Sequence, residues 1–366
     1  MTDVLVNSQD AKPQTKDTLH IYEVRQEIDD WLADYFADMI AMADDINAGY
    51  GDLWRAMKST VQNGGKRLRP YFLLLSYYGF GGRDIKSVIP VAASHELLHQ
   101  CLLMHDDIID RDYIRHGHPN VSGILQQKYS ELGHDAVHYA DSAAILAGDL
   151  LLSDTFSIIN QAGLGATVTE KLLQNVRRAV FHVAAGELID VECVTRMVDQ
   201  TDPMDIAYYK TASYSFILPL TSGALLVGAS DEAIAQIETL GRHLGVAYQI
   251  QDDILGLFGD EKITGKSTLS DLREGKHTFL ITETMSRVDK HDQATIQSAL
   301  GNNSLTPDDV NVVRQIIVNA GVYDDANQLV NLHSEAATKV ITELTIDSET
   351  KHQLLAVIQK LVGRKS

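Results

Sequence analysis

The stretch SVIPVAASHELLHQCLLMHDDIID, residues 87–110, is apolar for most of its length and ends in three aspartates. Its pattern predicts a long helix from near Ser87 to about Asp110. Asp106 and Asp110 are one helical turn apart and share a face, and Asp107 lies beside Asp110. Three carboxylates at this end repel one another and oppose the helix dipole, so a divalent cation would stabilise them. Oxygen ligands of this kind suit magnesium, although a solvated helix end would explain the cluster if it stood alone.

A second acidic pair stands in YQIQDDIL, residues 248–255. Asp252 and Asp253 also end a long apolar helical pattern, predicted over 232–255, and a glycine-rich segment over 256–270 follows them. Two acidic groups, each at a helix end before a loop, favour carboxylates that face each other across one cavity. That layout is typical of sites in which several metal ions hold a diphosphate.

The rest of the chain is also predicted to be helical. Only 7 of 366 residues are proline, and period-two strand patterns are scarce. Apolar residues recur at helical spacing over 21–45, and further helices are predicted over 140–160, 168–195, 206–227 (interrupted at Pro219) and from 271 to the end. Residues 1–20 are polar and are expected to be disordered. We therefore predict an all-α protein, with a single domain of ten or more helices over residues 21–366.

Composition narrows the classes of partner. The formal net charge is −19, which argues against a nucleic-acid partner. Two cysteines make no disulfide framework and fit a reducing compartment. The first residues lack a signal-peptide pattern, and the longest apolar stretch, 216–229, is shorter than the ~20 residues of a membrane span. We expect a cytoplasmic protein without a transmembrane segment.

A short basic segment, GGKRLRP at residues 64–70, is out of keeping with this acidic chain. Glycine permits close approach of a ligand to the backbone, and arginine can bind phosphate through two hydrogen bonds. An ordinary basic turn is the alternative. Further separated cations follow at Arg115, Lys210, Lys266 and Lys276. Acidic pairs together with separated cations suit two diphosphates, one held through metal and one held directly.

Five motifs in this order resemble the trans-prenyl diphosphate synthases of the polyprenyl synthetase family, which includes farnesyl and geranylgeranyl diphosphate synthases. The motifs are GGKRLRP (64–70), DDIID with Arg115, KTASY (210–214), QIQDD (249–253) and the region GK (265–266) with DLREGK (271–276). The resemblance implies a helical bundle around a deep central cavity, a homodimer, and magnesium as cofactor. It implies addition of isopentenyl diphosphate to an allylic diphosphate by ionisation, condensation and proton loss.

The resemblance also implies roles for individual positions. Isopentenyl diphosphate would be bound by Lys66, Arg69, His99 and the residue at 116. The allylic diphosphate would be bound by Arg115, Lys210, Lys266 and Lys276. Magnesium would be held at the aspartates Asp106, Asp110 and Asp252, with Asp107 as a further candidate ligand or support and Asp253 in support. Thr211 and Gln249 would line the place where the allylic cation forms.

The sequence departs from the family pattern at two positions. His116 stands where the family has a second arginine, and histidine is a weaker, pH-dependent cation. We expect His116→Arg to keep or improve the affinity for isopentenyl diphosphate. Gly256 stands where many members have a third aspartate, and nothing in the sequence shows that Asp260 replaces it. We expect activity to persist, with lower metal affinity.

In the family, residues just before the first aspartate motif limit product length. Cys101 and Leu102 are not aromatic here, and Leu98 lies one turn deeper. The expected product is therefore geranylgeranyl diphosphate or moderately longer, with farnesyl diphosphate as the alternative. A class I terpene cyclase and a non-catalytic subunit of a two-chain synthase are further alternatives. The basic segment argues against the cyclase, and the five aspartates of the two motifs argue against the inactive subunit.

Overall fold

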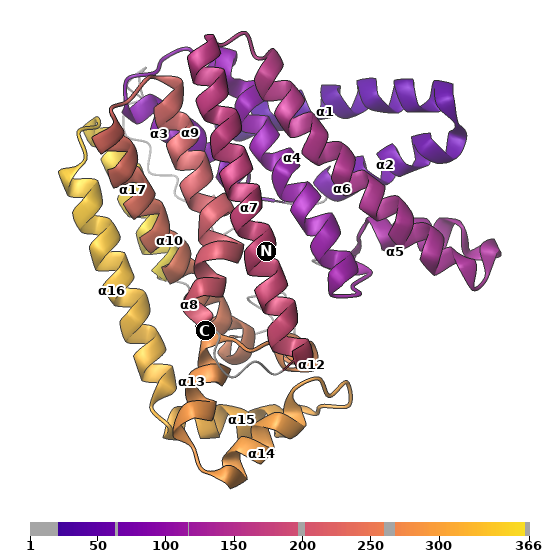
Figure 1. The fold of residues 1–366 in the computed structure, drawn as a ribbon, viewed down its shortest axis with the longest axis vertical. Helices are drawn as coiled ribbons and strands as arrows, with labels where there is room; N and C mark the ends of the chain where they lie inside the picture. Colours follow the sequence, from indigo (N-terminus) through magenta and orange to yellow (C-terminus); the bar gives the residue numbers. More distant parts are fainter. Residues whose placement is uncertain (1–20, 63–64, 116, 197–201, 260–267, 363–366) are drawn as a thin grey trace. The chain divides into compact units, whose positions relative to one another are not determined.

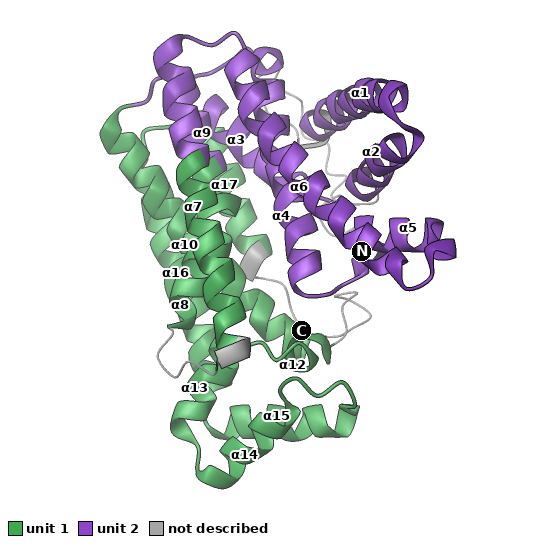
Figure 2. Ribbon diagram, turned by 45° about the vertical axis from the view of Figure 1, so that its right-hand side comes forward, with its two compact units in different colours: residues 1–18, 177–218, 230–366 green, residues 19–176, 219–229 purple. Residues whose placement is uncertain are grey.

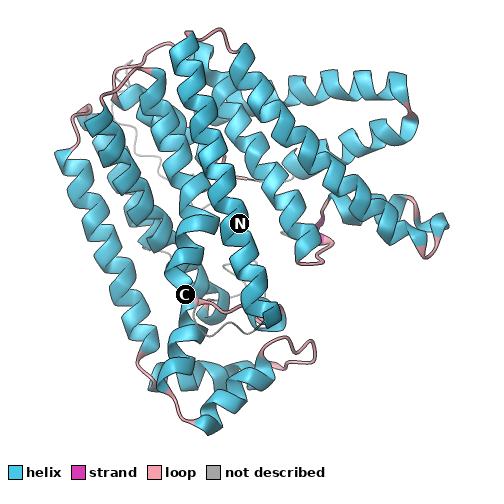
Figure 3. Ribbon diagram, in the orientation of Figure 1, coloured by secondary structure: helices cyan, strands magenta, loops and turns pink. Residues whose placement is uncertain are grey.

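The computed structural model describes residues 21–62, 65–115, 117–196, 202–259 and 268–362. Almost all of its regular structure is helical, which confirms the predicted all-α class (Figure 3). The described strands are two antiparallel strands of two residues each, in the segment after the first aspartate motif. The predicted disorder of residues 1–20 lies outside the described residues.

The chain divides into two compact units (Figure 2). Unit 2 contains Leu19–Val176 and Pro219–Ala229, and unit 1 contains Arg177–Leu218 and Ser230–Ser366 together with the first 18 residues. Two helices pass from one unit to the other, α7 (Ala166–Arg196) and α9 (Leu218–Leu226). We describe each unit by itself, and the single domain over 21–366 stays a prediction.

Unit 2 is built around α4, the helix predicted from the opening stretch. It spans Ile85–Ile109, and it packs against α3, α6 and α1 (Figure 1). α4 is buried on most sides because its residues are apolar almost all round, and Asp84 caps its first turn. The other elements are α1 (Ile21–Ile46), α2 (Ala48–Gln62), α3 (Leu68–Gly79), β1 (Ile114–Arg115), β2 (His118–Pro119), α5 (Val121–Lys128), the 3₁₀ turn η1 (Ser130–Leu132) and α6 (Asp135–Gln161).

Unit 1 is organised by α10 (Asp231–Phe258), the helix that carries the second aspartate motif. α10 packs against η2 (Ala207–Ile217) and α16 (Val322–Glu343). Apolar residues of its last turns enter a buried cluster with the C-terminal helices. The remaining helices are α8 (Pro203–Ile206), α12 (Ser270–Arg273), α13 (Phe279–Arg287), α14 (Lys290–Ala299), α15 (Pro307–Asn319) and α17 (Ser348–Val362).

The structure corrects three element boundaries. The predicted helix over 206–227 is three elements, because residues 207–217 form the π-helix η2. Pro219 does not interrupt the helical run; it is the second residue of α9, which follows η2 directly. The predicted loop over 256–270 starts too early, since α10 continues to Phe258.

By length and composition alone, α6 could cross a membrane. The core helix of a soluble protein passes the same test, and 39% of the apolar window of α6 is buried. One such helix is weak evidence, so the expected absence of a transmembrane segment stays a prediction.

Candidate active site

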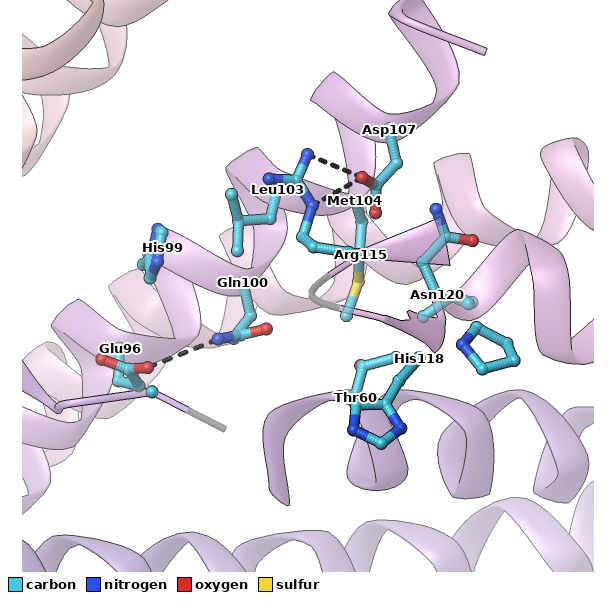
Figure 4. A pocket seen from close by; sticks show the side chains of 13 residues that line it. Thr60, Glu96, His99, Gln100, Leu103, Met104, Asp107, Arg115, His118 and Asn120 are labelled. Carbon is cyan, nitrogen blue, oxygen red and sulfur yellow. Dashed lines mark hydrogen bonds and ion pairs between the residues drawn. The ribbon is translucent and has the colours of Figure 1, made fainter. Parts of the chain in front are cut away.

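One face of α4 lines a pocket in unit 2 (Figure 4). The cavity has a volume of about 90 Å³. The residues that α4 contributes are spaced by three and four, so they share a face. These are Glu96, His99, Gln100, Leu103, Met104 and Asp107, and the other lining residues are Thr60, Gly65, Arg115, His118, Pro119, Asn120 and Val121. The pocket therefore joins residues of the basic segment, the first aspartate motif and the cation after it.

Arg115 joins the two adjacent aspartates of the first motif. Its guanidinium lies 2.7 Å from Asp106 Oδ2 and 2.6 Å from Asp107 Oδ1. The strand pair β1–β2 returns the chain toward α4, after Arg111 has ended the helix with a left-handed backbone (φ 58°). Burial raises the pKa of Asp107 to about 6, and the nearby Arg115 partly offsets this effect. Arg115, which is predicted to bind the allylic diphosphate, thus also holds the first aspartate motif in place.

The donor set of this motif fits magnesium. Asp106, on the last turn of α4, and Asp110, directly after the helix, are half-buried, whereas the side chain of Asp107 is only 6% exposed. Within the described part of the chain, no group of three or more His, Cys, Asp or Glu could hold a metal ion by itself. Magnesium needs no such cage, because it keeps several waters and takes one or two carboxylates together with substrate phosphate oxygens.

The basic segment differs from the prediction in detail. His99 and Gly65 line the pocket, but Lys66 and Arg69 are not among the lining residues. Lys66, shortly before α3, is exposed. Arg69, in the first turn of α3, is half-buried. Arg67, which had no predicted role of its own, is the buried cation among these three, at 5% exposure.

Some predicted site residues lie outside the described part of the chain. They are His116 and Lys266, as well as Asp260, the possible replacement for the missing third aspartate. Their roles stay predictions.

Lys210 in unit 1 forms ion pairs with two carboxylates. Its Nζ lies 2.6 Å from Asp190 Oδ2 and 3.0 Å from Glu187 Oε2, both on α7. Gly186 makes this possible, because a Cβ there would lie 2.3 Å from the backbone nitrogen of Lys210. Helix α7 therefore approaches the η2 backbone closely, and its Glu187 and Asp190 contact Lys210 of η2.

A chain of hydrogen bonds connects the Lys-Thr motif to the second aspartate motif. Thr211 Oγ1 donates to Gln249 Oε1 at 2.6 Å, and Gln249 Nε2 donates to Asp253 Oδ1 at 2.8 Å. The other oxygen of Asp253 accepts from the backbone N–H of Phe279 at 3.3 Å. Burial raises the pKa of Asp253 to about 8. Asp253 therefore orients Gln249, and its predicted support of magnesium binding stays a prediction.

The π-helical turn of η2 carries Lys210 and Thr211. Such turns are rare and are frequently found at functional sites. η2 packs on α10 so closely that a Cβ at Gly245 would lie 2.2 Å from the Cβ of Ala212.

The absence of a side chain at Gly256 leaves room for the carboxylate of Asp271. A Cβ at this position would lie 2.1 Å from Asp271 Oδ2, so the Asp271 carboxylate occupies the space beside α10 where a third aspartate side chain would begin. Lys276 lies 2.5 Å from Glu274, and its backbone N–H donates to the Asp271 carbonyl at 2.9 Å.

The predicted chain-length residues lie on α4. Leu98 and Cys101 are each 1% exposed, and Leu102 is half-buried. Burial, together with the nearby Asp149, raises the pKa of the Cys101 thiol to about 12. Cys101 is therefore a packing residue and not a nucleophile.

The sequence analysis missed several residues of these sites. Glu96, Gln100 and His118 line the pocket, and Arg67 contacts Glu96. Glu96 and Gln100 could have been found from their helical spacing to His99 and Asp107. Arg67 and His118 gave no such signal, because their positions depend on turns.

Comparison with known proteins supports the resemblance. Residues 52–317 match the sequence model of the polyprenyl synthetase family. A geranylgeranyl diphosphate synthase of Sulfolobus acidocaldarius is 32% identical over 92% of this chain and 99% of its own length. A geranylfarnesyl diphosphate synthase of Aeropyrum pernix is 30% identical over 90% of this chain and 98% of its own. The crystal structure of a geranylgeranyl pyrophosphate synthase from Corynebacterium glutamicum, complexed with isoprenyl diphosphate and magnesium, superposes with a TM-score of 0.89 at 28% identity, covering 95% of this chain and all of that one.

Proposed function

Because the chain belongs to the polyprenyl synthetase family and is thus a trans-prenyltransferase, we propose that it joins isopentenyl diphosphate to an allylic diphosphate and makes geranylgeranyl diphosphate or a moderately longer product. The observation that carries the proposal is the α4 pocket. His99, which we assign to isopentenyl diphosphate, lines the same pocket as Asp107 and Arg115.

We assign the site residues to two diphosphate-binding sites. Lys66, Arg69 and His99, with His116, bind isopentenyl diphosphate. The allylic diphosphate is bound by Arg115, Lys210, Lys266 and Lys276. Asp106, Asp110 and Asp252 would hold magnesium, with Asp107 and Asp253 in support, and bound magnesium would offset negative charge on the leaving diphosphate.

The reaction needs charge stabilisation more than a side-chain base. The C–O bond of the allylic diphosphate breaks, and its electron pair leaves with the diphosphate, whose charge Arg115 and Lys210 stabilise. The double bond of isopentenyl diphosphate then attacks the allylic carbon beside Thr211 and Gln249. The Asp253 hydrogen bond fixes the orientation of Gln249 at that place. The departing diphosphate accepts the proton that is lost.

Product length follows from the residues before the first aspartate motif. Cys101 and Leu102 are not aromatic, so no large ring limits the product there, and buried Leu98 lies one turn deeper. Relatives named for geranylgeranyl and geranylfarnesyl diphosphate support a product beyond farnesyl diphosphate.

The test is incubation of the purified protein with magnesium, farnesyl diphosphate and labelled isopentenyl diphosphate, followed by sizing of the products. We expect a product of twenty carbons or moderately more. If isopentenyl diphosphate is consumed with shorter primers but farnesyl diphosphate is never extended, the protein is a farnesyl diphosphate synthase. If no isopentenyl diphosphate is consumed, the proposed reaction is wrong.

We also propose a cytoplasmic homodimer. Helix α6 exposes Ile145 (47%) and Leu146 (58%) on adjacent positions, and burying such apolar surface favours association. Light scattering coupled to size-exclusion chromatography would measure the mass. A monomeric mass at micromolar concentration would contradict the proposal.

A further inference from the structure

Arg67 differs from its two basic neighbours. Its side chain is 5% exposed, whereas Lys66 is exposed and Arg69 half-buried. Its backbone is left-handed (φ 50°, ψ 39°). Residues other than glycine keep this conformation only where their surroundings hold them in it.

Three groups within the described residues hold the guanidinium of Arg67. Its Nε donates to Asp29 Oδ1 at 2.7 Å, and its Nη1 donates to Glu96 Oε1 at 2.8 Å. Its Nη2 donates to the carbonyl of Val61 at 2.8 Å. These partners lie on α1, α4 and α2, so one side chain fastens the turn before α3 to three helices of unit 2.

Glu96 connects the Arg67 contacts to the pocket. It lines the cavity, is 2% exposed, and accepts a hydrogen bond from Gln100 Nε2 at 3.3 Å (Figure 4). It also lies one turn before His99 on the same face of α4. A buried carboxylate in the wall of an anion-binding pocket repels the anion unless a cation offsets its charge. Arg67 is not a lining residue, so it offsets this charge from behind the wall.

Gly65 lies directly over the ion pair. A Cβ at Gly65 would be 2.9 Å from Arg67 Nη1 and 3.6 Å from Glu96 Oε1. The backbone of the basic segment therefore comes close to the Arg67–Glu96 pair at the point where this segment lines the pocket.

We propose that Arg67 is a positioning residue for isopentenyl diphosphate, because it neutralises Glu96 in the pocket wall and fixes the turn that presents Lys66 and Arg69. The inference rests on the proposed function, since it assigns isopentenyl diphosphate to this pocket.

The test measures binding of isopentenyl diphosphate by calorimetry, with each full-length variant held well below its own unfolding temperature. Arg67→Met should raise Kd about tenfold or more, because it leaves Glu96 unpaired. The double variant Arg67→Met with Glu96→Gln should regain most of this loss but stay a few-fold weaker than the wild type, because the uncompensated charge is gone while the contacts that fix the turn are still missing. In steady-state assays, KM for the allylic diphosphate should change less than about twofold in Arg67→Met.

Asp29→Asn is the matched control, because Asp29 is the charged partner of Arg67 that does not line the pocket. It should lower the unfolding temperature while Kd stays within about twofold. If Asp29→Asn weakens binding as much as Arg67→Met, or if the double variant does not recover, the network is merely structural and the inference is wrong. An unchanged Kd in Arg67→Met also overturns it.

Arg67→Lys keeps the test open if Arg67→Met does not fold. Lysine retains the charge but cannot reproduce the three-way contact of the guanidinium, so Kd should rise several-fold, and wild-type binding would overturn the inference. A wild-type protein that neither binds nor consumes isopentenyl diphosphate would instead overturn the proposed function. Wild-type binding with unaffected Arg67 variants would overturn the positioning role alone.

Discussion

Lowering the pH should destabilise unit 2 through His95. This side chain is 2% exposed; its Nδ1 lies 2.9 Å from the Val91 carbonyl and its Nε2 lies 3.1 Å from Ser222 Oγ. Burial lowers the pKa of His95 to about 4, against an ordinary value of 6.5. Below pH 6.5 the unfolded chain therefore binds a proton that the folded protein does not bind, and stability falls as the pH falls toward 4.

The size of this effect follows from the two pKa values. Between pH 7 and pH 5 the folded protein should lose about 2 kcal/mol through His95 alone, rising to about 3 kcal/mol at pH 4. The variant His95→Gln cannot be protonated, so its own loss over the same range should be smaller by about 2 kcal/mol. Comparing the two proteins cancels the contributions of the carboxylates, which both share.

The assay is urea unfolding at pH 7 and pH 5, followed by tryptophan fluorescence. Trp31 and Trp54, the two tryptophans of the chain, both lie in unit 2 with His95, so the signal reports the relevant unit. His138→Gln, at an exposed position of the same unit, is the control and should keep the wild-type pH dependence. Equal losses between pH 7 and pH 5 in the wild type and His95→Gln would refute the reasoning.

Three further substitutions probe the sites. Cys101→Phe places an aromatic ring at a buried position of α4, and product analysis should show mainly a shorter prenyl diphosphate. Gly186→Ala forces a methyl group to 2.3 Å from the Lys210 backbone nitrogen; thermal unfolding should show a loss of about 1–3 kcal/mol, and kcat should fall. Gly256→Asp places its Cβ 2.1 Å from the Asp271 carboxylate; calorimetry should show lower stability by about 1–3 kcal/mol and no gain in magnesium affinity.

Controls separate these effects from general damage. Gly165→Ala enters open space, so it should leave both stability and kcat near the wild-type values. A Gly186→Ala protein as stable as Gly165→Ala would contradict the close approach of α7 and η2. Unchanged product length in a folded Cys101→Phe enzyme would show that the growing chain does not pass Cys101. Tighter magnesium binding by Gly256→Asp would mean that a third aspartate fits beside Asp271.

The sequence by itself determined the helical class and the order of the motifs. Helical periodicity is a local property, so α1, α4, α6, α7 and α10 could be predicted within a few residues of their bounds. The spacing of Asp106, Asp110 and His99 likewise follows from one helix. Even so, the π-helix at 207–217 went unnoticed, because the apolar pattern over 206–227 was read as that of an ordinary α-helix.

Only the tertiary structure decided which charges meet. Lys210 pairs with acids 20 and 23 positions away on another helix, and helix packing sets that contact. In the basic segment, three cations within four residues look alike in sequence. The left-handed turn at Arg67 buries this side chain against Asp29 and Glu96, which come from helices far apart in the chain. Local sequence patterns therefore indicate which functional groups are present, whereas packing between distant segments determines which charged residues contact one another.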